Sequence, residues 1–288
     1  MKKYKAVFFD WDGTAVMSRK GPLEKTIQAM HELLSQGVKL IIVSGTTYEN
    51  IAGGRIQDYF QEEELKHLYL GLGRGAYNYK FEGKNPVIFK DRIPNTAELV
   101  KIHDVCYDIH KELLLKYNLN TDIIFSRPNY CKIDIMVENQ RGDQLFMQEN
   151  ELDILRKSLK NHGMENGLKD MLALAEKVGK QHGMKIAATC DAKYLEAGMS
   201  DKSDNVDSIL TELLEKAGIK PEECSFWGDE FVGLEEGIFG SDSYMKTEKT
   251  KTGDFFDVSE VIGKRPEGVE MVGGGVAAFL EFLKKQIR

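Results

Sequence analysis

Residues 5–14 read Lys-Ala-Val-Phe-Phe-Asp-Trp-Asp-Gly-Thr, and the interpretation of the whole chain starts from this stretch. The apolar run that follows Lys5 ends at Phe9 and is bounded by charge, which is typical of a strand buried on both faces of a sheet. Asp10 and Asp12 come directly after it. Residues i and i+2 of an extended segment point to the same side, so we expect their two carboxylates to converge.

Two neighbouring carboxylates repel each other unless a cation lies between them or one of them takes a proton. Either arrangement suits phosphoryl transfer, because a cation shields a carboxylate nucleophile and a protonated acid can serve the leaving oxygen. In open parallel sheets, ligands bind beyond the carboxyl ends of the strands, where Asp10 and Asp12 are expected. The alternative is a pair of strand-end aspartates that only cap the next turn.

The residues after this stretch predict a parallel sheet. Pro22 suits the first position of a helix. Apolar residues then recur at helical spacing, at Leu23, Ile27, Met30 and Leu34. A second buried strand is predicted at 38–43. Strand, helix and strand in this order form a βαβ unit, which implies parallel pairing.

The middle of the chain, roughly residues 85–195, has a different pattern. A helical stripe runs from Leu99 to Leu113, and Ile133, Ile135 and Val137 alternate with Asp134 and Met136 as in a strand with one packed face. Further helices are predicted at 152–159 and 168–178, and a strand at 184–189. We expect an antiparallel sheet with one helical layer. After residue 195 the pattern typical of a parallel sheet returns, with predicted helices at 206–214 and 276–287 and a predicted strand at 225–227.

Composition limits the class of protein. The chain has 288 residues, of which 42% are hydrophobic and 30% charged, and no stretch approaches the ~20 apolar residues of a membrane span. A net charge of −7 makes nucleic acid a poor partner. The four cysteines are scattered, which favours reduced structural thiols. We expect a cytoplasmic protein, a monomer or homodimer, with no membrane partner.

Asp10-Trp11-Asp12-Gly13-Thr14 resembles the D-x-D-G-T signature of the haloacid-dehalogenase superfamily of phosphatases. The second motif of that superfamily is a Ser or Thr that closes an apolar strand, and Ser44 follows residues 40–43 in this way. Gly45 comes next, and its backbone N–H suits a phosphate cradle. Taken alone, such a Ser-Gly-Thr is more often a plain helix N-cap.

The third motif is a lysine near the start of a late helix, and Lys202 matches it. A cation there would offset charge on Asp10 and on the phosphate; the alternative is a solvated pair with Asp201. The fourth motif is acidic, and Asp229 matches it. The second aspartate of the commonest pattern is missing.

The commonest pattern would place that second aspartate at Gly233 or Leu234. The second acid would then be Glu230, or else Glu235 or Asp242.

The resemblance implies roles for the matched residues. Mg²⁺ would be held by Asp10, the backbone carbonyl of Asp12, and Asp229, with Glu230 as a further candidate. Asp10 would be the nucleophile, and Asp12 would be held protonated by its charged surroundings to act first as acid and then as base. Ser44 and nearby N–H groups would hold the transferring oxygens together with Lys202.

The insertion between the second and third motifs resembles the α+β cap of the sugar-phosphatase, sucrose-phosphatase and phosphomannomutase branches. The predicted fold is therefore α/β, a Rossmann-like parallel-sheet core with helices on both faces and an inserted α+β cap. The predicted division is residues 1–84 and 196–288 for the core and 85–195 for the cap. The glycine-rich stretch 71–77 fits the turn that leads toward such a cap.

Within the cap, Arg127 and Lys132 could clamp an anionic or polyhydroxyl group, and Arg74 is a similar candidate. The alternative is that these are charges on the solvent face of a strand. The function predicted from the resemblance is Mg²⁺-dependent hydrolysis of a small phosphorylated metabolite, with a sugar phosphate favoured by analogy. Its rivals are a phosphomutase, a non-catalytic phosphometabolite-binding protein and a receiver-like domain.

Overall fold

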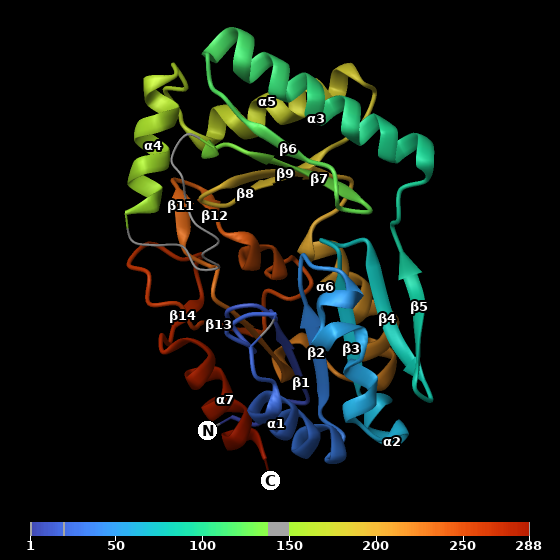
Figure 1. Ribbon diagram of the computed structural model, residues 1–288. Helices are drawn as coiled ribbons and strands as arrows, with labels where there is room; N and C mark the ends of the chain where they lie inside the picture. Colours follow the sequence, from blue (N-terminus) through green and yellow to red (C-terminus); the bar gives the residue numbers. More distant parts are fainter. Residues whose placement is uncertain (1, 20, 138–149, 288) are drawn as a thin grey trace.

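The computed structural model describes residues 2–19, 21–137 and 150–287. Within these ranges the larger sheet has eight strands (Figure 1). In order across this sheet they are β14 (Val269–Met271), β13 (Asp254–Asp257), β10 (Cys224–Gly228), β1 (Ala6–Phe9), β2 (Lys39–Val43), β3 (Leu68–Leu72), β4 (Tyr77–Glu82) and β5 (Asn85–Asp91). All pairs from β14 to β3 are parallel, and β4 and β5 extend the sheet by antiparallel pairing.

The strand β1 lies in the middle of this sheet and is fully buried, as its sequence predicts. Val7 and Phe9 pack on one face with helices α1 (Glu24–Ser35) and α7 (Gly275–Gln286). Ala6 and Phe8 pack on the other face with α6 (Lys202–Ile209) and the π-helical turn Leu210–Leu214 that continues it. The predicted α/β class, with helices on both faces, is confirmed.

A second sheet has four strands, all antiparallel, among the described residues. Their order is β6 (Asp122–Ile124), β7 (Tyr130–Asp134), β9 (Tyr194–Gly198) and β8 (Ala187–Cys190). Helices α3 (Thr96–Tyr117) and α5 (Leu168–Gln181) cover the face that is turned away from the larger sheet, and α4 (Glu151–Asn161) lies at one end (Figure 1). The uncovered face is turned toward the larger sheet.

Short elements complete the fold. The hairpin β11 (Gly233–Glu235) and β12 (Ile238–Phe239) packs Leu234 and Ile238 into the apolar core of the smaller sheet. The remaining helical segments are α2 (Glu62–Leu65) and the 3₁₀ turns Tyr48–Asn50, Ala52–Gly54, Ile56–Tyr59, Glu215–Ala217, Pro221–Glu223 and Ser241–Met245. No helix of the described chain is both long and apolar enough to cross a membrane. All four cysteines are buried free thiols.

The predicted alternation through Val137 is wrong in one respect. The strand β7 ends at Asp134, whose side-chain Oδ1 accepts a hydrogen bond of 2.9 Å from the Met136 N–H. This local turn takes the backbone out of the sheet, so Met136 is buried although the alternation predicted it on the open face. Residues 85–91, which the sequence-based division gave to the insertion, pair as β5 with β4 in the larger sheet. The division of the chain into core and cap stays a prediction.

Candidate active site

The loop that follows β1 is tied closely to the loop that follows β10. The Asp10 N–H donates to the Trp227 carbonyl at 2.9 Å, and the Thr14 hydroxyl donates to Asp229 Oδ1 at 3.0 Å. Gly13 has a φ of +88°, and a Cβ at this position would lie 2.2 Å from Asp229 Oδ2. Glycine is therefore required here, because any side chain would push the Asp229 carboxylate away from the loop.

Three carboxylates converge beside this loop. One oxygen each from Asp10, Asp229 and Asp242 lie within 4.8 Å of one another. Asp242 belongs to the 3₁₀ turn Ser241–Met245, is fully buried, and accepts the Glu230 N–H at 2.8 Å. It packs so tightly that a Cβ on Gly228 would lie 2.3 Å from its Oδ2. A set of hard oxygen donors such as this fits a divalent cation of the Mg²⁺ type.

Lys202 joins two of these acids. It is the first residue of α6, and the Asp201 carboxylate caps that helix by accepting the Ser203 N–H. The Lys202 Nζ donates to Asp10 Oδ1 at 3.0 Å and to Asp242 Oδ1 at 2.7 Å. Burial would lower the pKa of Lys202, but Asp10 and Asp242 outweigh that effect and raise it. The ammonium therefore stays charged beside Asp10.

The electrostatics of the acids follow from their crowding. Burial raises the pKa of Asp10 to about 8, with Lys202 opposing and Asp242 adding to the shift. Burial, then Asp242 and Glu230, raises the pKa of Asp229 well above its usual value. A bound cation would relieve the repulsion that these shifts reflect, so the residues present fit a metal site.

Asp12 lies on the same side of the loop as Asp10, while Trp11 between them is buried in the core. The Asp12 Oδ2 accepts from Arg19 Nε at 2.8 Å. Its Oδ1 is buried, and no hydrogen-bond partner for it exists among residues 2–19, 21–137 and 150–287. Both side chains line the same cavity, as expected of residues i and i+2, and Arg19 is an unforeseen partner of Asp12.

Ser44 and Gly45 follow β2 and line the same cavity. Ser44 is buried, and its N–H donates to the Gly71 carbonyl at 2.9 Å, which holds the residue at the strand end. Its hydroxyl accepts from the Thr46 N–H at 3.4 Å. The structure thus brings Ser44 to the strand edge that carries Asp10.

Glu230 and Glu235 are placed differently from Asp242. Glu230 lines the cavity, but its Oε2 accepts from the Ser241 hydroxyl at 2.7 Å, and the group of three acids does not include it. Glu235 accepts the Lys169 N–H at 3.2 Å beside α5. Of the three residues left open as the second acid, Asp242 is the one that the structure places with Asp10 and Asp229.

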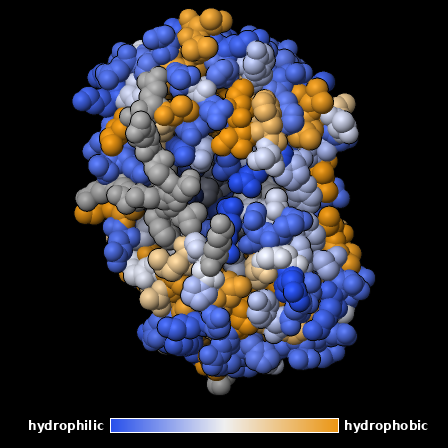
Figure 2. Space-filling view, viewed as in Figure 1, coloured by the Kyte–Doolittle hydropathy of each residue, from blue (hydrophilic) through white to orange (hydrophobic). Residues whose placement is uncertain are grey.

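A cavity of about 1080 Å³ separates Asp10 and Asp229 from the uncovered face of the smaller sheet. Figure 2 shows hydrophilic side chains around a recess at the centre of this face of the molecule. Asp10, Ser44 and Lys202 line one side of the cavity. Side chains from the smaller sheet, among them Lys132, Thr189 and Glu196, line the other.

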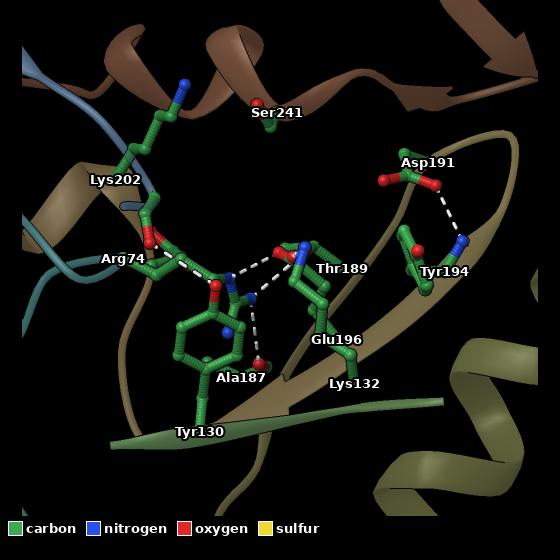
Figure 3. A network of polar contacts seen from close by, with 12 residues as sticks. Arg74, Tyr130, Lys132, Ala187, Thr189, Asp191, Tyr194, Glu196, Lys202 and Ser241 are labelled. Atoms are coloured by element: carbon green, nitrogen blue, oxygen red, sulfur yellow. Dashed lines mark hydrogen bonds and ion pairs between the residues drawn. The ribbon is translucent and has the colours of Figure 1, made fainter. Parts of the chain in front are cut away.

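Arg74 reaches from the turn between β3 and β4 into the smaller sheet (Figure 3). Its Nη2 donates to the Thr189 hydroxyl at 2.7 Å, and its Nε pairs with Glu196 Oε2 at 2.9 Å. The guanidinium carbon lies 5.0 Å from the centre of the Tyr130 ring. The other oxygen of Glu196, Oε1, pairs with Lys132.

Two of the three predicted substrate residues, Arg74 and Lys132, are therefore engaged with one carboxylate. The third, Arg127, lines the cavity with a buried Nε that has no hydrogen-bond partner in the described chain. Sequence reasoning missed Glu196 and Thr189, because it did not predict the strand that carries Glu196 and gave no role to the one that carries Thr189. The charged pattern Lys193-Tyr194-Leu195-Glu196 was the available signal.

Comparison with known proteins shows the family and the fold. A family model of haloacid dehalogenase-like hydrolases matches residues 7–231. No curated protein matches the sequence. Among solved structures, an N-terminally truncated IMP-nucleotidase from Plasmodium falciparum has a TM-score of 0.59 at 12% identity, covering 99% of this chain and 71% of that one.

Two further solved structures are similar along nearly their whole length. The C-terminal domain of trehalose-6-phosphate phosphatase from C. albicans has a TM-score of 0.60 at 14% identity, over 98% of this chain and 92% of that one. Sucrose-phosphatase from Synechocystis sp. PCC6803, in complex with sucrose and phosphate, has a TM-score of 0.53 at 13% identity, over 99% and 98%. At these identities the likeness shows the fold.

Proposed function

The chain belongs to the haloacid dehalogenase-like hydrolases, and from this premise we propose that it is a Mg²⁺-dependent phosphomonoester hydrolase acting on a small phosphorylated metabolite. The reaction would pass through an acyl phosphate on Asp10. The observation that carries the proposal is the position of Asp10, with Lys202 Nζ 3.0 Å from its Oδ1 and two further acids within 4.8 Å, at the floor of a metabolite-sized cavity.

Asp10, Asp229 and Asp242 would hold the cation, together with the backbone carbonyl of Asp12. When bound there, Mg²⁺ neutralises negative charge on the phosphate and on the Asp10 carboxylate. Lys202 adds a second positive charge on the same side. The Ser44 hydroxyl and the N–H of Gly45 would hold the phosphate oxygens that are not transferred.

In the first step an oxygen of Asp10 forms a bond to phosphorus while the bond from phosphorus to the leaving oxygen breaks. Asp12 gives its proton to that oxygen, so the leaving group departs as an alcohol. In the second step Asp12 takes a proton from the water that cleaves the acyl phosphate, and Asp10 and inorganic phosphate are regenerated. Asp12 Oδ2 is paired with Arg19 at 2.8 Å, so the proton would be carried by Oδ1, which has no hydrogen-bond partner in the described chain.

The smaller sheet and its helices would act as the cap that selects the substrate and excludes water. Because β5 belongs to the larger sheet and β6 to β9 form the smaller one, we propose that this cap begins after β5 and ends after β9. A sugar phosphate is the favoured substrate class, because two of the similar structures are a sucrose-phosphatase and a trehalose-6-phosphate phosphatase.

The test is a panel of phosphorylated metabolites assayed for released inorganic phosphate, with Mg²⁺ and with EDTA in parallel. Asp10→Asn should abolish turnover while the protein stays folded, as its circular dichroism spectrum checks, and the exposed Asp153→Asn serves as the matched control. A variant at Asp10 that keeps more than about a tenth of the wild-type rate, a loss under ~1.4 kcal/mol, contradicts the assignment.

The same panel separates the alternatives. A phosphomutase would move phosphate within the substrate and release little of it. A phosphometabolite-binding protein would bind members of the panel with Mg²⁺ and turn over none of them. Binding alone does not require a lysine placed between Asp10 and Asp242, and this observation favours the hydrolase.

A further inference from the structure

The wall of the cavity that faces Asp10 is rich in positive charge. It presents four cationic side chains, Arg74, Arg127, Lys132 and Lys193, against two acidic ones, Asp191 and Glu196. Lys193 is balanced outside the wall by Asp134, at 3.4 Å. The remaining three cations face two carboxylates, an excess of one positive charge.

Of the two carboxylates, Glu196 offers little to a hydroxyl group of a substrate. Both oxygens of Glu196 are engaged, one by Arg74 and one by Lys132 (Figure 3). Burial would raise the pKa of Glu196, but Lys132, Arg74 and Arg127 lower it to about 2. The Asp191 Oδ1 accepts the N–H groups of Lys193 and Tyr194, each at 2.6 Å. Burial raises the pKa of Asp191, and Lys132 opposes this shift.

Arg127 is the cation that nothing balances directly. It lies in the loop between β6 and β7, lines the cavity, and is partly buried. Its Nε is buried without a hydrogen-bond partner, and neither an ion pair nor a hydrogen bond engages its guanidinium within the described ranges. A buried charged donor without an acceptor is costly, so an acceptor supplied by a ligand would be stabilising here.

We propose that the substrate carries a second anionic group, a carboxylate or a second phosphate, on the part that remains after phosphate leaves, and that Arg127 binds this group. This inference rests on the proposed function, because it concerns the same cavity. Lys132 and Arg74 hold Glu196 and add to the positive potential behind Arg127. A neutral polyol presents donors and acceptors alike, whereas a wall with an excess of cationic donors, whose Glu196 carboxylate is already engaged, selects an oxyanion.

The test compares substrates that differ in one carboxylate. Glucose 6-phosphate and 6-phosphogluconate form one pair, and glycerol 3-phosphate and 3-phosphoglycerate form a shorter one. We expect kcat/KM to be at least tenfold higher for the acid in one of the pairs. Arg127→Gln should reduce this preference at least tenfold, and Arg127→Lys should keep part of it. Arg55→Gln, at an exposed ion pair remote from the cavity, should leave the preference unchanged.

Three results would overturn the inference. The neutral member of each pair could be the better substrate; a folded Arg127→Gln protein could keep the full preference; or Arg55→Gln could lower it as much. Hydrolysis of neutral esters alone would leave the proposed function intact. If no ester is hydrolysed, calorimetric titration of the same pairs in Mg²⁺ decides: tighter binding of the acids that depends on Arg127 supports the inference without the hydrolase, and equal binding rejects it.

Discussion

Replacing Asp242 by Asn tests whether the third acid of the metal site is the one that the structure places there. The Asp242 carboxylate is fully buried, accepts Lys202 Nζ at 2.7 Å, and lies within 4.8 Å of Asp10 and Asp229. The amide keeps the size of the side chain and one oxygen, but it removes a negative charge. Residues that only hydrogen-bond to a metal ligand already contribute about 10–100-fold to the affinity for the metal. We therefore expect Asp242→Asn to bind Mg²⁺ at least tenfold more weakly than the wild type.

The magnitude follows from linkage between binding and folding. At a Mg²⁺ concentration 100 times the dissociation constant, binding stabilises the folded protein by about 2.7 kcal/mol. With about 2–4 °C per kcal/mol for a chain somewhat smaller than this one, the wild-type melting temperature should rise by roughly 5–11 °C over its value in EDTA. For Asp242→Asn at the same concentration the gain falls to about 1.4 kcal/mol, roughly half the shift.

The assay is thermal unfolding of each protein in EDTA and in a Mg²⁺ series, so that each variant is compared with itself. Glu230→Gln is the matched control, because its carboxylate accepts from Ser241 and lies outside the group of three. The rise in its melting temperature on adding Mg²⁺ should match that of the wild type to within about 2 °C, which corresponds to ~0.5 kcal/mol. The reasoning is refuted if Asp242→Asn keeps the full shift, or if Glu230→Gln loses as much of it.

Three further predictions concern the two sides of the cavity. Gly13→Ala places a Cβ 2.2 Å from Asp229 Oδ2, so kcat/KM should fall at least ~100-fold, while Gly218→Ala, with similar φ and open space, should not affect it. Arg74→Met breaks a buried pair and should lower the free energy of unfolding by about 3–5 kcal/mol in urea, without rescue by Lys. The pKa of Glu196 is lowered to about 2 in the folded protein. The stability that this carboxylate contributes is therefore present at pH values above its pKa in the unfolded chain, and it is lost as the pH falls toward 2. The stability gap between wild type and Glu196→Gln, measured in urea, should therefore narrow from pH 7 to pH 3.5, and a constant gap would contradict this.

The sequence was sufficient for the core because its signals there are local. The run up to Phe9 is apolar on both faces and ends in Asp10, so the strand and its chemistry lie within ten residues. Ser44 and Lys202 could be assigned in the same way, each next to the element that holds it. Their convergence then follows from parallel pairing, which brings the carboxyl ends of neighbouring strands to one edge.

The rest depended on contacts between distant segments. Asp242 lies twelve residues after Glu230, and the β11–β12 hairpin between them returns the chain so that Asp242 accepts the Glu230 N–H. Nothing in the spacing distinguishes it from Glu235. The strand β9 has only five residues, and its central residue, the charged Glu196, faces the cavity. Period-based reasoning reads such a short segment as a loop.

The two sides of the cavity are held in different ways, and this difference bears on how each can change. On the side of the larger sheet, Asp10 is held by a backbone hydrogen bond, and Asp229 and Asp242 lie against glycines. Such positions tolerate almost no substitution. On the facing side, Arg74, Glu196 and Lys132 hold one another through side chains, while Arg127 lies in a loop with no partner in the described chain. A change at Arg127 disturbs no other pair, so under the proposed function selectivity would shift there while the arrangement around Asp10 is kept.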